Sequence, residues 1–221
     1  MGNSSLTPSI HVLDDDCLLN IFYLHRPAIF DGDKGSLFRI DGGRGWDRER
    51  WWYRLAQVCQ RWRKIILRST SYLGLCLVCT PGTPIADMLA NSPPLPLIID
   101  YHKHHNISAE EENEIIFALE QRERVHRVRI SFPVPNMERF ITVIEGEYPI
   151  LEYLIMSTPV GDKSANLILT ETFQAPHLRY LTLIGFAILI GSRLLTTAVG
   201  LVSLFLARRV GVDKRSQVIV N

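Results

Sequence analysis

The residues whose types and spacing come nearest to a chemical site are two cysteines and a later group of histidines. Zinc prefers four tetrahedral Cys and His ligands, and a Cys-x-x-Cys pair with two histidines could supply them. The segment that holds both cysteines has the pattern of a strand, in which residues three apart point to opposite faces. The spacing therefore favours buried cysteines over a metal site, and we expect neither a metal nor a cofactor. The residues concerned are Cys76, Cys79, His102, His104 and His105.

A second candidate is the basic stretch from Arg44 to Arg68, which has eight Lys and Arg residues against Asp47 and Glu49. Basic residues mixed with tryptophans can indicate nucleic-acid binding. On a helix, however, Trp51 and Trp62 fall on the apolar stripe, so the aromatic and basic side chains do not share a face. The pattern favours a solvated basic face, and we expect no nucleic-acid partner.

Motifs typical of enzymes are missing from the sequence. There is no Gly-x-Ser-x-Gly elbow, no phosphate-binding Gly-x-x-x-x-Gly-Lys loop and no His-Glu-x-x-His pair. An acidic run at Glu110, Glu111, Glu112 and Glu114 suits the first turn of a helix, where negative charge complements the helix dipole. The sequence therefore predicts a protein that is not an enzyme.

The composition is that of a globular chain. Of 221 residues, 47% are hydrophobic and 21% charged, and the net charge is +1. Four cysteines are few for a disulfide framework, and the N-terminus lacks a basic segment followed by an apolar one. We expect a cytoplasmic or nuclear location.

The first expected helix covers residues 13–24. Asp14, Asp15 and Asp16 supply cap oxygens and favourable charge at its start. Three apolar residues, Leu18, Ile21 and Phe22, then fall on one face. Residues 1–11 are expected to be disordered, and the Gly- and Asp-rich residues 27–47 to form a surface insertion.

The strongest single pattern predicts one long helix across residues 51–66. Its apolar residues recur at helical spacing and form an unbroken stripe. They are Trp51, Leu55, Val58, Cys59, Trp62, Ile65 and Ile66.

From Leu73 onward the sequence alternates short apolar strands with helical segments. Four strands share the template apolar-x-x-apolar-x-apolar and begin at Val125, Leu151, Leu178 and Leu201. Two less regular strands are expected at 75–79 and 95–101. Intervening helices include one that opens with a Ser108–Glu111 capping box and one that carries Met137, Phe140, Ile141 and Ile144 on a single face. A strand–helix unit at this period is typical of a leucine-rich solenoid.

Residues 180–206 are nearly continuous apolar sequence, which raises the alternative of a membrane anchor. Arg193 lies in the middle, where a charge costs about 2.5–3.5 kcal/mol on insertion scales. The repeat template explains the same leucines, so the sequence favours a protein without a membrane span.

The N-terminal third resembles the F-box of the large fungal F-box families. The matching residues are Val12-Leu13, then 18–22 (LLNIF), then 51–63 (WWYRLAQVCQRWR). The sequence departs from the family at Asp14, where a proline is usual, and in the insertion at 27–47. The resemblance implies that an F-box docks the Skp linker subunit of a cullin–RING ubiquitin ligase. It assigns that contact to Leu13, Leu18, Ile21, Phe22, Val58, Cys59 and Trp62.

The resemblance thus implies an α/β chain in two parts. A helical F-box-like domain covers 12–73, a short, irregular leucine-rich-repeat-like α/β solenoid covers 74–207, and a tail that continues no repeat covers 208–221. The expected function is the substrate-recognition adaptor of an SCF-type ligase, with the repeats binding an unknown target protein. The alternatives are a repeat-based interaction module whose degenerate F-box no longer docks, or a protein anchored in a membrane through 180–206.

Overall fold

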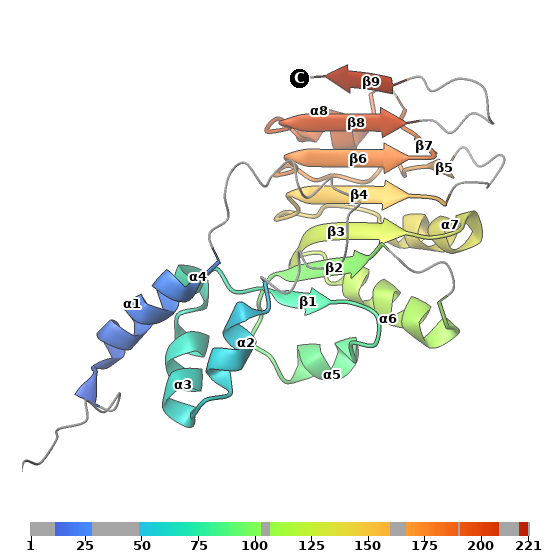
Figure 1. The fold of residues 1–221 in the computed structure, drawn as a ribbon. Coiled ribbons are helices and arrows are strands. Elements are labelled where there is room, and N and C mark those ends of the chain that lie inside the picture. Colours follow the sequence, from blue (N-terminus) through green and yellow to red (C-terminus); the bar gives the residue numbers. More distant parts are fainter. Residues whose placement is uncertain are drawn as a thin grey trace, which may run out of the picture. The chain divides into compact units, whose positions relative to one another are not determined.

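The computed structural model describes residues 12–27, 49–102, 107–159, 167–189 and 191–207, together with the backbone of 217–220. The chain divides into two compact units, Met1–Cys76 and Leu77–Asn221. The described part of the first unit is helical, and the second is built on a sheet (Figure 1). The chain is therefore a mixed α/β protein with a mostly parallel sheet, as the sequence predicts.

Helix α1 (Asp15–His25) opens the first unit. The Asp14 side chain caps it, because one carboxylate oxygen accepts a hydrogen bond of 2.7 Å from the Cys17 amide. Leu18 and Phe22, one turn apart, are buried on its inner face. Asp14 thus fixes the start of this helix through its side chain.

The prediction of one long helix across residues 51–66 is wrong. The chain forms α2 (Trp51–Ala56) and α3 (Gln60–Arg68), and Cys59 between them is extended, with φ −160°. Helix α2 buries Trp52 and Ala56, which lie outside the predicted stripe. Residues 57–59 contain no Gly or Pro, so local propensity gives no sign of the break. It lets α3 change direction and pack against α1, and tertiary contact overrides propensity here.

Two contacts join α3 to α1. The rings of Phe22 and Trp62 lie 4.8 Å apart at 60°. Arg61 bonds both the Asp15 carboxylate, at 2.8 Å, and the Leu13 carbonyl, at 2.6 Å. A last helix, α4 (Thr70–Leu73), ends at Gly74 in the left-handed conformation, a common helix stop. The segments expected to pack together in this unit therefore do so.

The second unit is a seven-stranded sheet. Six parallel strands lie side by side in sequence order, and a seventh pairs antiparallel with the last of them. The strands are β1 (Leu77–Cys79), β2 (Leu97–Tyr101), β3 (Val125–Ser131), β4 (Tyr153–Ser157), β6 (Tyr180–Ile184), β8 (Ser203–Ala207) and β9 (Gln217–Val220).

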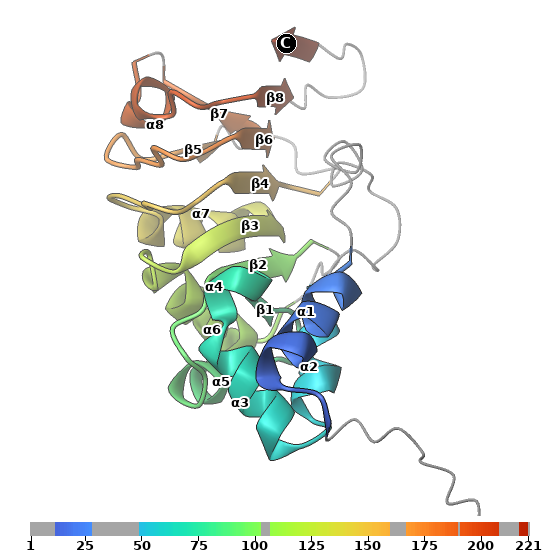
Figure 2. The ribbon, with the colours of Figure 1, turned by 90° about the vertical axis from the view of Figure 1, so that its left-hand side faces the viewer.

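One face of this sheet carries the described helices (Figure 2). They are α5 (Ile85–Ala90), α6 (Ala109–Glu120), α7 (Val134–Val143) and α8 (Arg193–Thr197). The Ser108–Glu111 capping box at α6 is confirmed. On the connections around β6 the chain instead forms two short strands, β5 (Leu167–Ile168) and β7 (Phe186–Ala187), which pair with each other. The sequence did not predict this second sheet.

Equivalent positions of the repeat template pair with one another across the sheet. Its second positions, Val128, Leu154, Leu181 and Leu204, are direct partners across neighbouring strands. Its third positions, Ile130, Met156, Leu183 and Leu206, pair in the same way. Both sets pack into one hydrophobic core or against its margin. Because side chains alternate along a strand, the residues between them occupy the opposite face.

Residues 180–206 do not form a single long helix. They contribute β6, β7, α8 and β8, and none of the helices in the described part of the chain is long and apolar enough to cross a membrane. Within the segment 208–221, which was predicted to continue no repeat, residues 217–220 form β9, a strand that pairs antiparallel with β8 and so does not extend the parallel array. Antiparallel pairing with β8 explains why residues 217–220, which include β-branched Val and Ile, adopt a strand there.

Candidate functional site

The seven residues expected to dock a partner occupy three kinds of position in the helical unit. Leu18 and Phe22 are at most 1% exposed and form part of its core. Leu13 and Trp62 are half-buried. Ile21 is 46% exposed, Val58 is 60% exposed and Cys59 is exposed as well. Only the last three present apolar atoms freely, and we call them the docking triad.

The break between α2 and α3 determines where two members of the triad, Val58 and Cys59, lie. In an unbroken helix, Val58 and Cys59 would share the stripe of Ile65 and Ile66, both of which are buried. In the structure they occupy the turn that joins the two helices. The turn leaves Val58 open to solvent, a position that the spacing alone did not predict.

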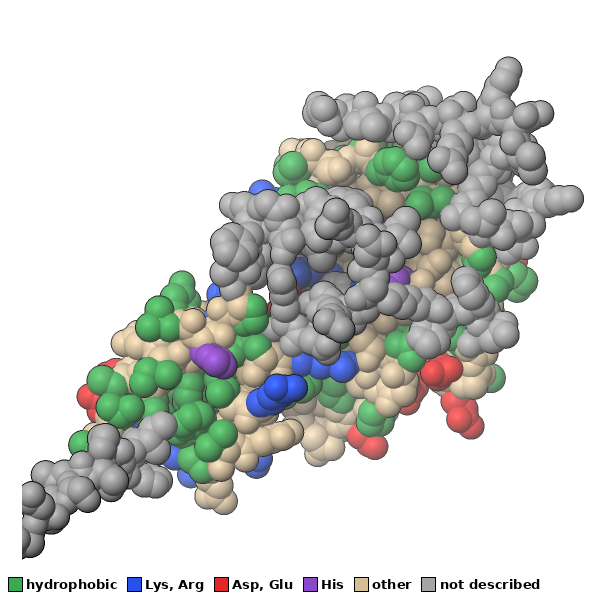
Figure 3. Space-filling model, viewed as in Figure 1, with side chains coloured by type: hydrophobic (Ala, Val, Ile, Leu, Met, Phe, Trp, Pro, Cys, Tyr) green, Lys and Arg blue, Asp and Glu red, His purple; other side chains and the backbone are tan. Residues whose placement is uncertain are grey.

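Further exposed apolar side chains surround α1. Leu24 is 82% exposed and Val12 is 83% exposed. The rings of Tyr23 and Tyr72, both about half exposed, pack at a tilt of 35° with centroids 5.0 Å apart. Figure 3 shows hydrophobic side chains gathered over these helices. Tyr23 and Leu24 were not predicted as surface residues because they lie off the Leu18–Phe22 face of α1.

A second candidate site lies on the sheet face opposite the described helices. Pairing places Asp100, Arg129, Ile155, Thr182 and Phe205 in one transverse row. Arg127, Tyr153, Tyr180 and Ser203 form the row nearer the amino ends of the strands. The face therefore changes from charged on β2 and β3 to aromatic and apolar on β4, β6 and β8.

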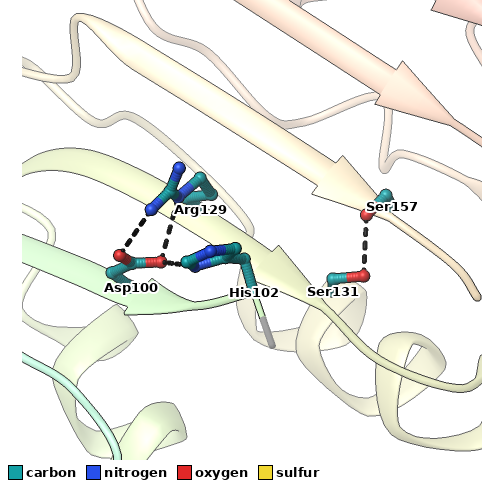
Figure 4. Close-up of polar contacts among 5 residues, drawn as sticks. All are labelled: Asp100, His102, Arg129, Ser131 and Ser157. Atoms are coloured by element: carbon teal, nitrogen blue, oxygen red, sulfur yellow. Dashed lines mark hydrogen bonds and ion pairs between the residues drawn. The ribbon is translucent and has the colours of Figure 1, made fainter. Parts of the chain in front are cut away.

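Asp100 is the centre of the charged part (Figure 4). It is only 3% exposed. Arg129 binds it with two nitrogens, at 3.0 and 2.8 Å, and His102 Nδ1 lies 2.6 Å from its Oδ1 atom. Burial alone would raise the pKa of this carboxyl, but the hydrogen bonds from His102 and Arg129 and the positive charge outweigh it and lower the pKa. Asp100 is therefore held ionised.

Two further contacts order this face. The Ser157 hydroxyl donates to Ser131 Oγ at 2.8 Å, across the ends of β3 and β4 (Figure 4). The rings of Tyr153 and Tyr180 stack at 4.5 Å and 8°, with the Arg127 guanidinium 4.9 Å from the centre of the Tyr153 ring. Tyr153, Tyr180 and Asp100 are at most 8% exposed, so these contacts order the interior of this face, and the half-buried Arg127 and Arg129 are its more accessible charged side chains. Alternation in Val-His-Arg-Val-Arg-Ile-Ser (125–131) was the available sequence signal for it.

The proposed metal ligands do not come together among the described residues. Cys76 and Cys79 are buried and form no disulfide in the described part of the chain, and Cys79 belongs to the hydrophobic core. His102 bonds Asp100 instead, while His104 and His105 lie outside the described residues. Within those residues, no cluster of three or more His, Cys, Asp and Glu side chains could hold a metal ion.

Comparison of the chain with models of protein families, with curated protein sequences and with solved structures returned no match.

Proposed function

We propose that this chain is the substrate-recognition adaptor of an SCF-type ubiquitin ligase. Its helical unit docks the Skp linker subunit, and the sheet unit binds the target protein. The observation that carries this proposal is the docking triad, since Ile21, Val58 and Cys59 remain exposed at positions that match the F-box motif.

Because some motif residues are buried and others exposed, the helical unit can bind a Skp subunit without unfolding. Leu18 and Phe22 hold the unit together, so a partner meets the triad and the half-buried rim of Leu13 and Trp62. Fully burying a Val or Ile side chain contributes about 1.5–3 kcal/mol. Ile21 and Val58, each already about half covered, would contribute on the order of 1 kcal/mol each, so the neighbouring exposed residues must also take part.

The departure at Asp14 does not argue against docking. A proline at that point would fix the entry into α1, and the Asp14 side chain achieves the same start by accepting from the Cys17 amide. That hydrogen bond also lowers the pKa of the Asp14 carboxyl, which favours its charged form.

The sheet unit would recognise the target. Asp100, Tyr153 and Tyr180 are at most 8% exposed, so they would fix the shape of the face opposite the helices, and the half-buried Arg127 and Arg129 would be its side chains within reach of the target. The mechanism is proximity. Holding the ligase and the target on one scaffold raises their effective concentration for ubiquitin transfer, and this chain supplies no reacting group.

The competing function is a repeat-based interaction module that does not engage a Skp subunit. The sheet unit would serve this module equally well. The two functions therefore differ only in whether the chain binds a Skp subunit. A binding titration of the full chain with a purified fungal Skp subunit tests this. We expect Ile21→Asp and Val58→Asp each to weaken binding at least about tenfold, which corresponds to about 1.4 kcal/mol.

Ile168→Asp is the control matched to Ile21→Asp. Both isoleucines are 46% exposed, but Ile168 lies in the sheet unit. Binding of this variant should equal that of the unchanged chain. A folded chain that fails to bind any Skp subunit would favour the competing module, and binding that survives both docking substitutions would place the contact elsewhere.

A further inference from the structure

The chain from Arg50 to Leu75 carries only positive charge. It has six Lys and Arg residues and no Asp or Glu. Arg61 is neutralised by Asp15, at 2.8 Å. Four of the other basic residues are exposed, and they are Arg54, Arg63, Lys64 and Arg68. The helical unit therefore presents positive charge to solvent along α2 and α3.

Three of these side chains share the outer side of α3. Ile65 and Ile66 are buried on the inner side of this helix. Successive residues of a helix are turned by about 100°, so Arg63, Lys64 and Arg68 fall on the side opposite the two isoleucines, and all three are exposed. We call these three residues the basic face.

The basic face begins beside the docking triad. The Arg63 side chain donates from Nε to the Ala56 carbonyl, at 3.0 Å, and its backbone amide donates to the Cys59 carbonyl, at 3.1 Å. Its guanidinium is thus held against the turn that carries Val58 and Cys59. The two exposed apolar positions and the basic face form one continuous surface, and apolar contacts bordered by charged ones are the usual composition of a protein interface.

We propose that the basic face binds an acidic segment of the Skp subunit and thereby sets the rate and orientation of docking. This inference rests on the proposed function. Exposed ion pairs add little to equilibrium affinity, but complementary charges attract a partner over about 10 Å at 0.1 M salt and speed its association. Burial of the docking triad then determines how slowly the complex dissociates.

A nucleic acid fits the same surface less well. Proteins that hold single strands stack the bases on exposed aromatic rings between basic side chains. In this unit the Trp62 ring packs on Phe22, and Trp52 is buried. The exposed side chains next to the basic face are Val58 and Cys59, which suit the apolar part of a protein surface.

The association and dissociation rates of the full chain with a purified fungal Skp subunit test the proposal. In biolayer interferometry, association should slow at least about tenfold between about 0.05 and 0.5 M NaCl. At the lower salt, Lys64→Glu and Arg68→Glu should each slow association at least about threefold and change dissociation by less than about twofold. Val58→Asp should instead act mainly by speeding dissociation.

Arg193→Glu is the matched control, because Arg193 is also exposed but lies on α8 of the sheet unit. It makes the same change of charge and should leave both rates unchanged. Lys64 and Arg68 are exposed, so their variants should stay folded, which circular dichroism checks.

Four results would overturn the proposal. Association that is equally fast in both α3 variants, or equally slowed by Arg193→Glu, would exclude a specific role for the basic face while leaving Skp docking intact. A folded chain that binds no Skp subunit would remove the proposed function and this inference together. Binding to a short DNA duplex that is tighter than to the Skp subunit, and is lost in both α3 variants, would assign the face to nucleic acid.

Discussion

Asp100 is the most heavily engaged ionised side chain on the polar sheet face, and its replacement gives a quantitative test of that site. Asp100→Asn keeps the shape of the side chain and removes the charge that binds Arg129 and His102. The amide also places a donor against the donors of Arg129. We expect the sheet unit to lose stability and the order of the contacts around Arg129 and His102.

The magnitude follows from burial. Removing one partner of a buried ion pair costs about 3–5 kcal/mol because the other charge is left uncompensated. Arg129 and His102 keep 16% and 18% exposure, so water reaches them in part and the lower end, about 3 kcal/mol, applies. In a unit of this size, that corresponds to a fall in Tm of about 6–12 °C.

The pH dependence has a definite sign. The folded-state pKa of Asp100 is below its ordinary value of 3.8, so its contribution is complete above that value and is lost as the pH falls through the folded pKa. Urea titrations followed by far-UV circular dichroism across pH 2–7 should show a shallower acid loss in Asp100→Asn than in the unchanged chain.

Asp87→Asn is the control, because Asp87 is exposed on α5 and its replacement should change stability by about 0.5 kcal/mol or less. Equal stability of Asp100→Asn and the unchanged chain at neutral pH would refute the account of this site. So would an identical acid limb in the two proteins.

Three further substitutions test the packing of the sheet unit. Gly185→Ala should cost about 2 kcal/mol or more in urea unfolding, because φ is +87° and the new Cβ would clash with Thr158 Oγ1. Gly200→Ala places its Cβ in open space and should be neutral. Ser108→Ala should cost about 1 kcal/mol by removing the α6 cap, seen as faster hydrogen exchange in its first turn. Burial raises the pKa of Tyr148 to about 12. The contribution of the protonated tyrosine to folding stability is therefore complete below pH about 10 and is lost as the pH rises through about 12. Tyr148→Phe should remove that alkaline step from an absorbance titration.

Local patterns predicted the elements that depend on local chemistry. The capping box found the start of α6, and the repeat template found the pairing of β3, β4, β6 and β8. Both rest on periodicity and side-chain hydrogen bonds between near neighbours, which the sequence carries directly.

Elements that depend on distant contacts were not predictable in this way. The break at 57–59 has no Gly or Pro, and it exists because α3 packs on α1 through Trp62 and Arg61. Strand β9 needs β8 as its template, and the pairing of Asp100 with Arg129 needs the register of β2 on β3. The motif also assigned docking to seven residues, whereas burial keeps Leu18 and Phe22 inside the unit.

Trp62 is an unsuitable position at which to test Skp docking. Its ring packs on Phe22, so Trp62→Asp would disturb the helical unit as well as any interface, and its loss of binding would not distinguish the two. Exposed residues avoid this ambiguity.

The most direct measurement is therefore the affinity of a purified fungal Skp subunit for the full chain and for Val58→Asp, with circular dichroism to show that both are folded. The account predicts a complex with the unchanged chain and at least tenfold weaker binding by the variant. The same affinity for both proteins would contradict it.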